Sequence, residues 1–209
     1  YGFNIWSFIG VVFIVISFTN STFCQNNAVV VLANEKFSQF LNLRDFSISK
    51  SNDEIYFTAQ STSQEISQIL YLKKIKGKWS NPLLMPFSNV YSDLEPFLSF
   101  DQNTLYFASN RPLVESSNAK KDFDIWYVTR KNKNSDWSKP QNMGAPVNSE
   151  NNEFYPSLSK NNDLYFTSDA TTATTKDDIY FCRYENGSYQ SPKPLSTIIN
   201  SNGYEFNAF

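Results

Sequence analysis

Acidic side chains recur at matched places along this chain of 209 residues. Asp93, Glu153 and Glu205 each precede a short apolar run, while Asp124 and Asp178 open the runs "DIWY" and "DIYF". Carboxylates gathered in one place could bind a cation or a basic segment of a partner. An Asp at the start of a strand can instead accept hydrogen bonds from backbone N–H groups of a neighbouring loop. The repetition favours this structural role, because a binding site seldom needs the same group three times.

Arg111 is a basic side chain that the matched segments do not repeat. It can form a salt bridge with a neighbouring acid such as Asp124, or it can point into a binding surface. The other basic residues gather in two runs at matched turns, "KKIKGK" (73–78) and "RKNKN" (130–134), and there we expect solvated hairpin tips. A feature that occurs once in a repetitive chain is where a specific function is expected, so Arg111 is a candidate binding residue.

The residues that are missing exclude several kinds of chemistry. The chain has no histidine, which excludes Ser-His-Asp and Cys-His nucleophile systems and zinc sites that contain His. A calcium loop of the form DxDxDG with a closing Glu is also missing. Paired carboxylates would still allow glycoside hydrolysis, but "SFDQNTLY" matches the sialidase box Ser-x-Asp-x-Gly-x-Thr-Trp only in part. We therefore expect no catalytic residues, no metal and no cofactor, and the net charge of −2 predicts no nucleic-acid partner.

The acids recur because whole segments of the chain recur. Three landmarks return in the same order about every 50 to 60 residues. The first is an aromatic pair, the second is an aromatic near Ser and Pro, and the third is an apolar run between them. In sequence order the landmarks are "IYF" (Tyr56), "LYF" (Tyr106) and "LYF" (Tyr165); "KWSNP" (Trp79), "DWSKP" (Trp137) and "SYQSP" (Tyr189); and "QILYLKK", "FDIWYVTRK" and "DDIYFCRY".

Each repeated unit reads as four short antiparallel strands, which is typical of a β-propeller blade. A strand such as "EPFLSF" is followed by a polar turn, "DQN" or "KNN", and by a second strand, "TLYFAS" or "DLYFTS". A third strand, "DIWYVTRK" or "DIYFCRY", precedes an edge segment that contains Pro, "WSKPQNMG" or "YQSPKPLS". The sequence predicts an all-β fold with blades at 42–91, 92–149 and 150–201 and the start of a fourth at 202–209. Three blades cannot close a ring, so we expect a fragment of a larger propeller.

The first residues read as an export signal. Residues 5–18, "IWSFIGVVFIVISF", form an apolar run that suits a secretory signal better than a membrane span. We predict a signal peptide over 1–24 with a truncated start and a lead-in over 25–41; the alternatives are a buried core segment, an uncleaved anchor or a lipid on Cys24. Cleavage after Cys24 leaves Cys182, which we expect to fill space in a strand rather than to react. The mature chain would have no membrane span.

From about residue 44 to 209 the chain resembles the WD-repeat-like propeller of the TolB type, a family of exported proteins of Gram-negative bacteria. The resemblance rests on "SDLEPFLSFDQNTLYFASNRP", "DFDIWYV" and "DWSKPQNMGAPVNSENNEFYPSLS". The family's turn is usually Ser-Pro-Asp-Gly, and here Gln102 or Asn162 replaces the glycine, of which Asn tolerates a left-handed backbone better than Gln does. The family's "SNRP" is kept at 109–112 and becomes Ser168 and Asp169 in the third unit. The candidate binding residues are then Arg111, Asn110, Asp124, Glu153, Asp169 and Asp178.

The resemblance implies the fold more firmly than the function. It predicts an exported module, periplasmic or extracellular, that binds an envelope protein, a peptide or a cell-wall component such as peptidoglycan or another glycan, without catalysis. The alternative is a carbohydrate-active or hydrolytic propeller whose site lies partly in blades outside this sequence.

Overall fold

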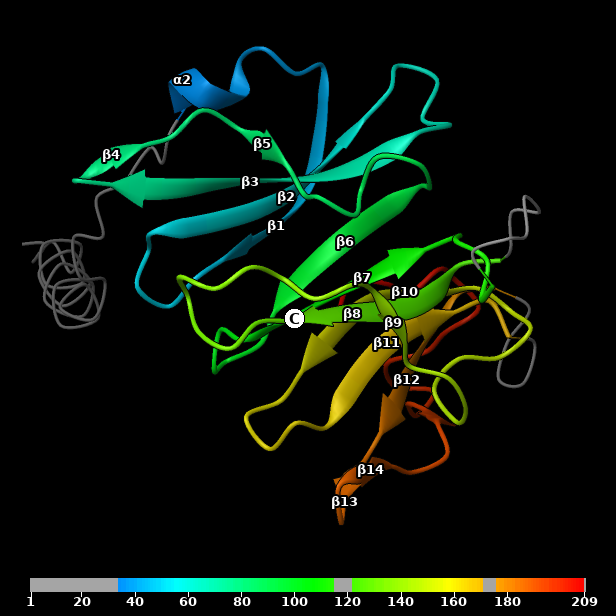
Figure 1. Ribbon diagram of the computed structural model, residues 1–209. Coiled ribbons are helices and arrows are strands. Elements are labelled where there is room, and N and C mark those ends of the chain that lie inside the picture. The colour runs from blue at the N-terminus through cyan, green and yellow to red at the C-terminus, as the bar shows by residue number, and fades with distance from the viewer. Residues whose placement is uncertain (1–33, 115–121, 171–175, 209) are drawn as a thin grey trace, which may run out of the picture. The chain divides into compact units, whose positions relative to one another are not determined.

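In the described part of the chain, three antiparallel sheets of four or five strands follow one another, with one two-stranded hairpin beside the third (Figure 1). The computed structural model describes residues 34–114, 122–170 and 176–208, and residues 35–209 form one unit. The predicted signal peptide, Cys24 and most of the lead-in lie outside the described residues. Within the described part of the chain, no helix has the length and apolarity that a membrane crossing requires.

The sheets correspond to the three repeated units, here called blades one to three. Blade one contains β1 to β5, blade two contains β6 to β9, and blade three contains β10, β11, β12 and β15, with β13 and β14 as a separate hairpin. The bounds are α2 (Asn34–Phe37), β1 (Asn42–Ile48), β2 (Glu54–Gln60), β3 (Ser67–Ile75), β4 (Lys78–Trp79), β5 (Leu83–Leu84), β6 (Asp93–Leu98), β7 (Thr104–Ser109), β8 (Asp124–Thr129), β9 (Gln141–Asn142), β10 (Glu153–Leu158), β11 (Leu164–Ser168), β12 (Asp178–Cys182), β13 (Tyr184–Glu185), β14 (Ser188–Tyr189) and β15 (Lys193–Pro194).

The predicted all-β fold with several four-stranded antiparallel sheets is confirmed, and its departures lie at the edges. The expected edge segment "WSKPQNMG" is reduced to the two residues of β9, which begin directly after Pro140, a residue that cannot donate to a ladder. Residues 202–208, where we expected the first strand of a fourth blade, belong to no strand, since a strand needs a neighbour with which to pair.

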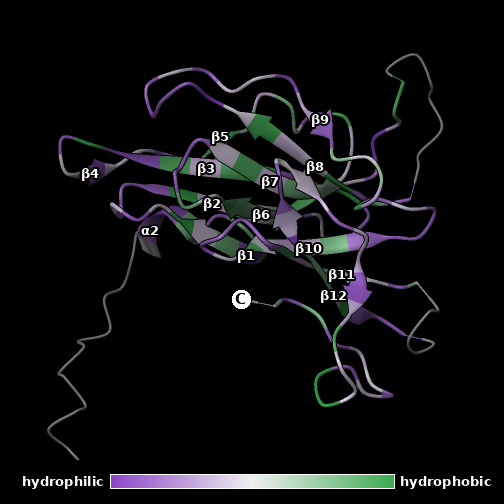
Figure 2. Cartoon of the chain, turned by 90° about the horizontal axis from the view of Figure 1, so that it is seen from below, coloured by the Kyte–Doolittle hydropathy of each residue, from purple (hydrophilic) through white to green (hydrophobic). Residues whose placement is uncertain are grey.

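The second strand of each blade is apolar on both sides, and the sheet of blade two is covered on both faces by its neighbours. In β7, Phe107 belongs to a buried cluster with Tyr56 and Ile69 of blade one. The next residue back, Tyr106, packs against a second cluster, which contains Leu158 of blade three. Successive side chains of a strand point to opposite faces, so we name the face toward the following blade the forward face and the opposite one the backward face. Figure 2 shows hydrophobic colour on several of these strands.

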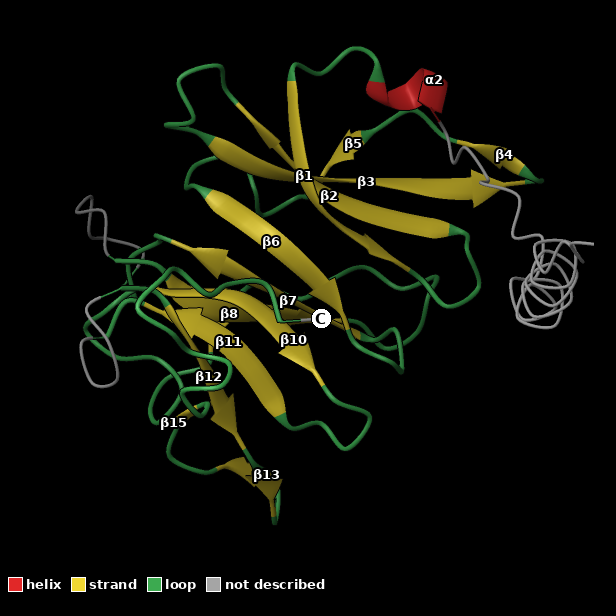
Figure 3. Cartoon of the chain, turned by 180° about the vertical axis from the view of Figure 1, so that it is seen from behind, coloured by secondary structure: helices red, strands yellow, loops and turns green. Residues whose placement is uncertain are grey.

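Blade one has no preceding blade among the described residues, and α2 and the residues after it cover its backward face. Phe57 on this face stands where Phe107 stands in blade two. Phe37 and Phe40 contact the Phe57 ring edge-on at centroid distances of 5.3 and 5.7 Å. Figure 3 shows α2 beside this first sheet. The segment thus supplies the apolar cover that a neighbouring blade provides elsewhere.

Cys182 lies within the cluster between blades two and three and is fully buried. Burial raises the pKa of its thiol to about 12. The prediction of a space-filling cysteine is confirmed, because a buried thiol that stays protonated is a poor nucleophile.

Each hairpin between the first and second strands contains one residue with a left-handed backbone. The φ angles are 54° at Asn52, 62° at Gln102 and 65° at Asn162. These are the turns in which the sequence places Asn or Gln at the family's glycine position, and both residues do adopt the glycine-like conformation. For a residue with a Cβ this conformation costs roughly 1–2 kcal/mol.

We therefore expect that Gln102→Gly raises the free energy of unfolding by up to about 1 kcal/mol, because it relieves the left-handed strain. Asn162→Gly is the matched control and should gain less than half as much, since Asn tolerates this conformation. Urea unfolding of the two variants measures the difference. A loss of stability in Gln102→Gly, or an equal gain in both, would contradict the explanation.

Candidate functional site

The first strand of every blade carries a bulge at the same position. The register shifts between Arg44 and Ser47 in β1, and again at the equivalent places in β6 and β10. One residue in each bulge has a left-handed backbone, and the following residue is proline in blades two and three, where the bulge removes it from the ladder. These left-handed residues are Asp45 (φ 55°), Glu95 (φ 59°) and Tyr155 (φ 49°), and Asn207 (φ 62°) matches them after blade three.

The bulges bring together a guanidinium, two carboxyl groups and a phenol, here named the bulge cluster: Arg44, Asp45, Glu95 and Tyr155. Arg44 Nε donates to Asp45 Oδ2 at 2.7 Å, and Arg44 Nη2 donates to Glu95 Oε1 at 3.2 Å and also to the Tyr155 hydroxyl. The backbone N–H of Tyr155 donates to Glu95 Oε2 at 2.6 Å. Side chains at a repeated but strained backbone position, each of a different type, are where a specific role is expected.

Glu95 is the most deeply buried member of the bulge cluster. The residue is 5% exposed. Burial and the nearby Asp45 carboxylate raise the pKa of Glu95 to about 8, although the Tyr155 N–H and Arg44 act in the opposite direction. Burial likewise raises the pKa of Asp45, against the pull of Arg44. Burial in the cluster therefore favours the neutral form of the Glu95 carboxyl group.

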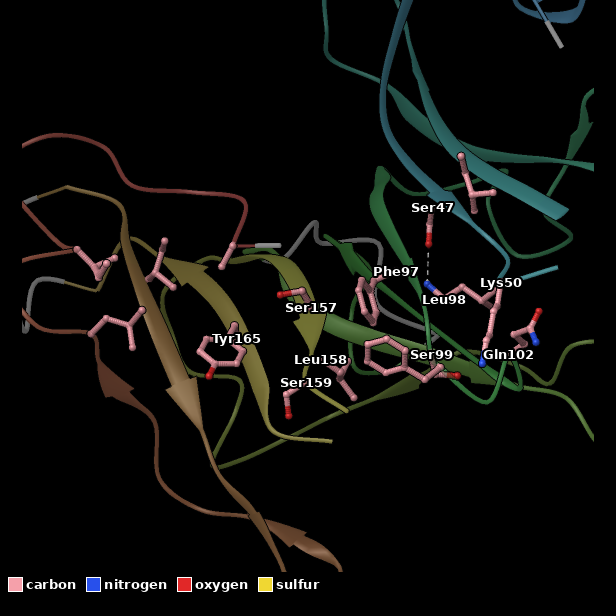
Figure 4. Close-up of a pocket in the computed structure, with 16 residues that line it drawn as sticks. Ser47, Lys50, Phe97, Leu98, Ser99, Gln102, Ser157, Leu158, Ser159 and Tyr165 are labelled. Atoms are coloured by element: carbon pink, nitrogen blue, oxygen red, sulfur yellow. Dashed lines mark hydrogen bonds between the residues drawn. The ribbon is translucent and has the colours of Figure 1, made fainter. Parts of the chain in front are cut away.

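A larger pocket opens beside the bulge cluster, here named the open pocket (Figure 4). Its volume is about 680 Å³, within the usual range of roughly 300–1,000 Å³ for ligand sites. The ends of the first strands form one wall, where the Leu98 N–H donates to Ser47 Oγ at 2.9 Å across two blades. The forward face of blade three forms the other wall. Apolar lining residues include Ile48, Phe97, Phe100, Tyr165, Ile179 and Leu195.

Charge is nearly missing from the open pocket. Among the lining residues, all of which the structure describes, Lys50 is the one ionised group and none is a carboxylate. The carboxyl groups of Asp45 and Glu95 line a separate neighbouring cavity of about 40 Å³. The open pocket can therefore take up apolar side chains, whereas the neighbouring cavity is too small for a sugar ring.

The structure places Arg111 in the interior of blade two. Its Nη2 donates to Asp93 Oδ1 at 2.6 Å, and the guanidinium lies 5.3 Å from the Phe107 ring centroid and 5.4 Å from that of Trp126. The predicted salt bridge is thus formed, but with Asp93 rather than with Asp124. Asp93 and Asp124 both lie opposite Ser109, on the two strands that flank β7, and the Arg111 guanidinium reaches the acid on the β6 side.

The other candidate residues take part in hydrogen bonds that hold loops. Asn110 Oδ1 accepts from the Ser92 N–H at 2.9 Å, and Asp124 Oδ2 accepts from Asn142 Nδ2 at 2.8 Å. Glu153 accepts from the Ser149 hydroxyl at 2.5 Å, and Asp169 accepts from the Asn152 N–H at 2.8 Å. Asp178 opens β12 and is buried. The structure brings none of the six to the open pocket, and a partner-binding role for them stays a prediction.

One expectation about the basic runs is wrong. Arg130 was expected at a solvated hairpin tip, but its side chain is fully buried and forms two hydrogen bonds to Glu54 of blade one, at 2.9 and 2.6 Å. It also lies 4.5 Å from the Trp137 ring centroid. A guanidinium can pair with a carboxylate through two parallel bonds, and the pairing of blades one and two supplies that carboxylate.

Sequence reasoning missed the bulge cluster and the open pocket. The sequence did contain a signal for the bulge position, which lies two residues after each matched acid. The pairs are Asp93 and Glu95, Glu153 and Tyr155, and Glu205 and Asn207. The amino acid at the position of Glu95 differs from unit to unit, whereas the residues around it repeat. In the described part of the chain, no group of three or more Cys, Asp or Glu side chains could hold a metal ion.

Comparison with known proteins gives a distant structural likeness. No family model matches the chain, and no curated protein sequence matches it. A puromycin-hydrolysing peptidase of Mycobacterium tuberculosis has a TM-score of 0.50 at 11% identity, with 73% of this chain and 22% of that chain covered. TolB from Acinetobacter baumannii gives 0.45 at 14% (72% and 32% covered), and hydrazine synthase of Kuenenia stuttgartiensis gives 0.49 at 13% (80% and 26% covered).

This chain therefore spans between about a fifth and a third of the length of the solved chains that it matches. At such identities the likeness to the peptidase concerns the fold alone. The chain is similar, in its stacked antiparallel sheets, to part of β-propeller-containing proteins.

Proposed function

We propose that the chain is part of an exported, TolB-type β-propeller that acts without catalysis and binds a protein, peptide or cell-wall component of the bacterial envelope. The observation that carries this proposal is the open pocket, which is large, mostly apolar and without a carboxylate. Such a surface takes up apolar side chains of a partner, with the serine hydroxyls and Lys50 at its wall to orient them. The residue pattern shared with exported propellers supports the envelope location.

One observation favours the rival function, a carbohydrate-active propeller. Glu95 has the raised pKa of a general acid, and Asp45 offers a second carboxylate nearby. Both groups are held by one guanidinium, however, and Glu95 is enclosed by the Tyr155 backbone and a small cavity. A glycosidase needs two carboxyl groups that reach opposite sides of a glycosidic bond, so the binding function has the better support.

The test is capture of partners from a Gram-negative envelope extract by the immobilised chain, compared between two variants. Ile199→Asp places a charge at the open pocket, and Ile66→Asp places one on the loop between β2 and β3; the two isoleucines are 49% and 57% exposed. We expect Ile199→Asp to retain at least tenfold less of a captured partner than the unchanged chain, and Ile66→Asp to retain it fully. Hydrolysis of an envelope glycan by the chain, or equal capture by all three proteins, would overturn the proposal.

A further inference from the structure

Four tyrosine side chains gather where blades two and three meet. Tyr106 and Tyr127 pair across β7 and β8, with ring centroids 6.1 Å apart. Tyr184 and Tyr189, here named the tyrosine pair, face each other across β13 and β14 at 4.9 Å. Tyr189 packs against the same buried cluster as Tyr106. Burial, and then the Tyr106 side chain, raise the pKa of Tyr189, which favours its neutral phenol.

The tyrosine pair replaces a different pair of side chains in the other two blades. At the matched positions of the repeat, blades one and two each carry a cation over an indole ring. The Lys74 Nζ lies 5.5 Å from the Trp79 ring centroid, and the Arg130 guanidinium lies 4.5 Å from that of Trp137. Blade three has two phenols in their place. The repeat therefore does not dictate the tyrosine pair, which is a feature of blade three alone among the described blades.

The register of the hairpin holds the two phenol rings against each other. Tyr184 and Tyr189 lie directly opposite, in the hairpin that Figure 1 shows beyond the end of β12. The Gln190 N–H donates to the Arg183 carbonyl at 2.8 Å, so the neighbouring tyrosines occupy a position without ladder hydrogen bonds. Side chains approach each other most closely at such positions of an antiparallel ladder. The planes of the two rings meet at 57°.

The turn and an anchoring hydrogen bond fix the hairpin that carries the tyrosine pair. Asn186 and Gly187 form the two-residue turn, with φ angles of 52° and 83°. Left-handed backbone at both positions gives a turn whose twist matches that of the two strands. The Tyr184 N–H also donates to Asp163 Oδ1, in the turn before β11, at 2.9 Å. The contact between the rings is therefore built into the backbone of blade three.

The tyrosine pair is also the tyrosine contact that an oxidant in solution can best reach. Among the described residues, the other two contacts between tyrosine rings are longer, at 6.1 Å for Tyr106 with Tyr127 and 6.2 Å for Tyr56 with Tyr71. Tyr56 is fully buried, whereas Tyr184 is 37% exposed. A radical formed on the Tyr184 ring therefore has a second phenol already in contact with it.

We propose that Tyr184 and Tyr189 are an oxidative modification site, at which a dityrosine cross-link forms within blade three. Each phenol loses one electron and one proton, and a carbon–carbon bond forms between the ring carbons next to the two hydroxyl groups. The hydrogens of those two carbons then pass to the oxygens, which restores both phenols. The oxidant is hydrogen peroxide acting through a peroxidase. One peroxide takes up the two electrons and two protons and becomes two water molecules.

The experiment treats the full chain with hydrogen peroxide and a peroxidase. Denaturing gel filtration removes chains that are linked to one another, and dityrosine fluorescence is measured in the single-chain fraction. We expect Tyr184→Phe and Tyr189→Phe each to give at least tenfold less fluorescence than the unchanged chain, because phenylalanine has no hydroxyl hydrogen to lose. Tyr204→Phe is the matched control and should leave the fluorescence unchanged, although Tyr204 is 62% exposed. Gly187→Val keeps both phenols but opposes the left-handed turn, and it should lower the fluorescence at least threefold.

Peptide mapping identifies the two linked rings. Cleavage after Glu185 separates Tyr184 from Tyr189 along the chain, so the expected product is a joined pair of peptides in the mass spectrum. A link from Tyr106 to Tyr127 or to Tyr189 in its place would overturn the proposal. Equal fluorescence from Tyr184→Phe and the unchanged chain would also overturn it. Equal fluorescence from Gly187→Val would do the same, because it would show that the hairpin geometry does not direct the reaction.

Discussion

Replacing Arg130 with methionine is expected to lower the free energy of unfolding by about 3–5 kcal/mol, because it leaves a buried carboxylate without its main partner. Both side chains of the Arg130–Glu54 pair are fully buried, and the pair joins blades one and two. Burial by itself raises the pKa of Glu54, but the hydrogen bonds and charge of Arg130, with a smaller contribution from Lys73, hold it below its usual range. Urea unfolding followed by far-UV circular dichroism measures the loss.

Two variants test the cause of this loss. Arg183→Met removes the guanidinium from an exposed pair with Glu185 at 3.4 Å, and it should change the stability by no more than about 0.5 kcal/mol. Glu54→Leu combined with Arg130→Met should recover most of the loss, because no charge is then left buried. A double variant as unstable as Arg130→Met alone would show that the packing of Arg130 on Trp137, rather than the orphaned charge, dominates.

The second large effect is a dependence of stability on pH that Glu95→Gln should reduce. The pKa of Glu95 is about 8 in the folded chain against an ordinary value of 4.5. Between these values the folded state binds one more proton than the unfolded state, so unfolding releases a proton and is favoured as the pH rises. The stability from this group is complete below pH 4.5 and is lost through pH 8, at up to about 1.4 kcal/mol per pH unit.

Urea unfolding at pH 5, 6, 7 and 8 tests this prediction. Glu95→Gln should flatten the decline, and most of the remaining slope should come from Glu153, whose pKa burial raises to about 7. Glu150→Gln, at an exposed position, is the control and should follow the unchanged chain. Curves for Glu95→Gln and the unchanged chain that run parallel over this range would sink the assignment of the proton to Glu95.

The repeated units were predictable from the sequence because their causes are local. The spacing of aromatic pairs and polar turns places the strands within each sheet, and Gln102 and Asn162 mark the left-handed turns of blades two and three. A blade covered on both faces requires apolar residues at consecutive positions, and "LYF" provides them. Local chemistry thus predicts the sheets and their order along the chain.

The candidate site was not predictable in the same way, because its contacts join distant residues. Arg44 meets Glu95 and Tyr155, which lie 51 and 111 positions away. Arg130 likewise meets Glu54 across 76 positions, so a charge run that looks solvated includes one side chain inside the protein. The pairing of charged side chains depends on how two sheets stack. The repeat period does not specify that stacking.

The alternation of Tyr and Phe in each second strand has a consequence for how such a chain can change length. Because every blade carries one face of each kind, removing or duplicating one whole unit leaves each remaining contact between a forward and a backward face. A change of half a unit would instead leave two faces of the same kind opposed and their apolar residues uncovered. Insertions and deletions are therefore tolerated when they add or remove one whole unit. This constrains how the number of repeats can change in evolution, rather than what the protein binds.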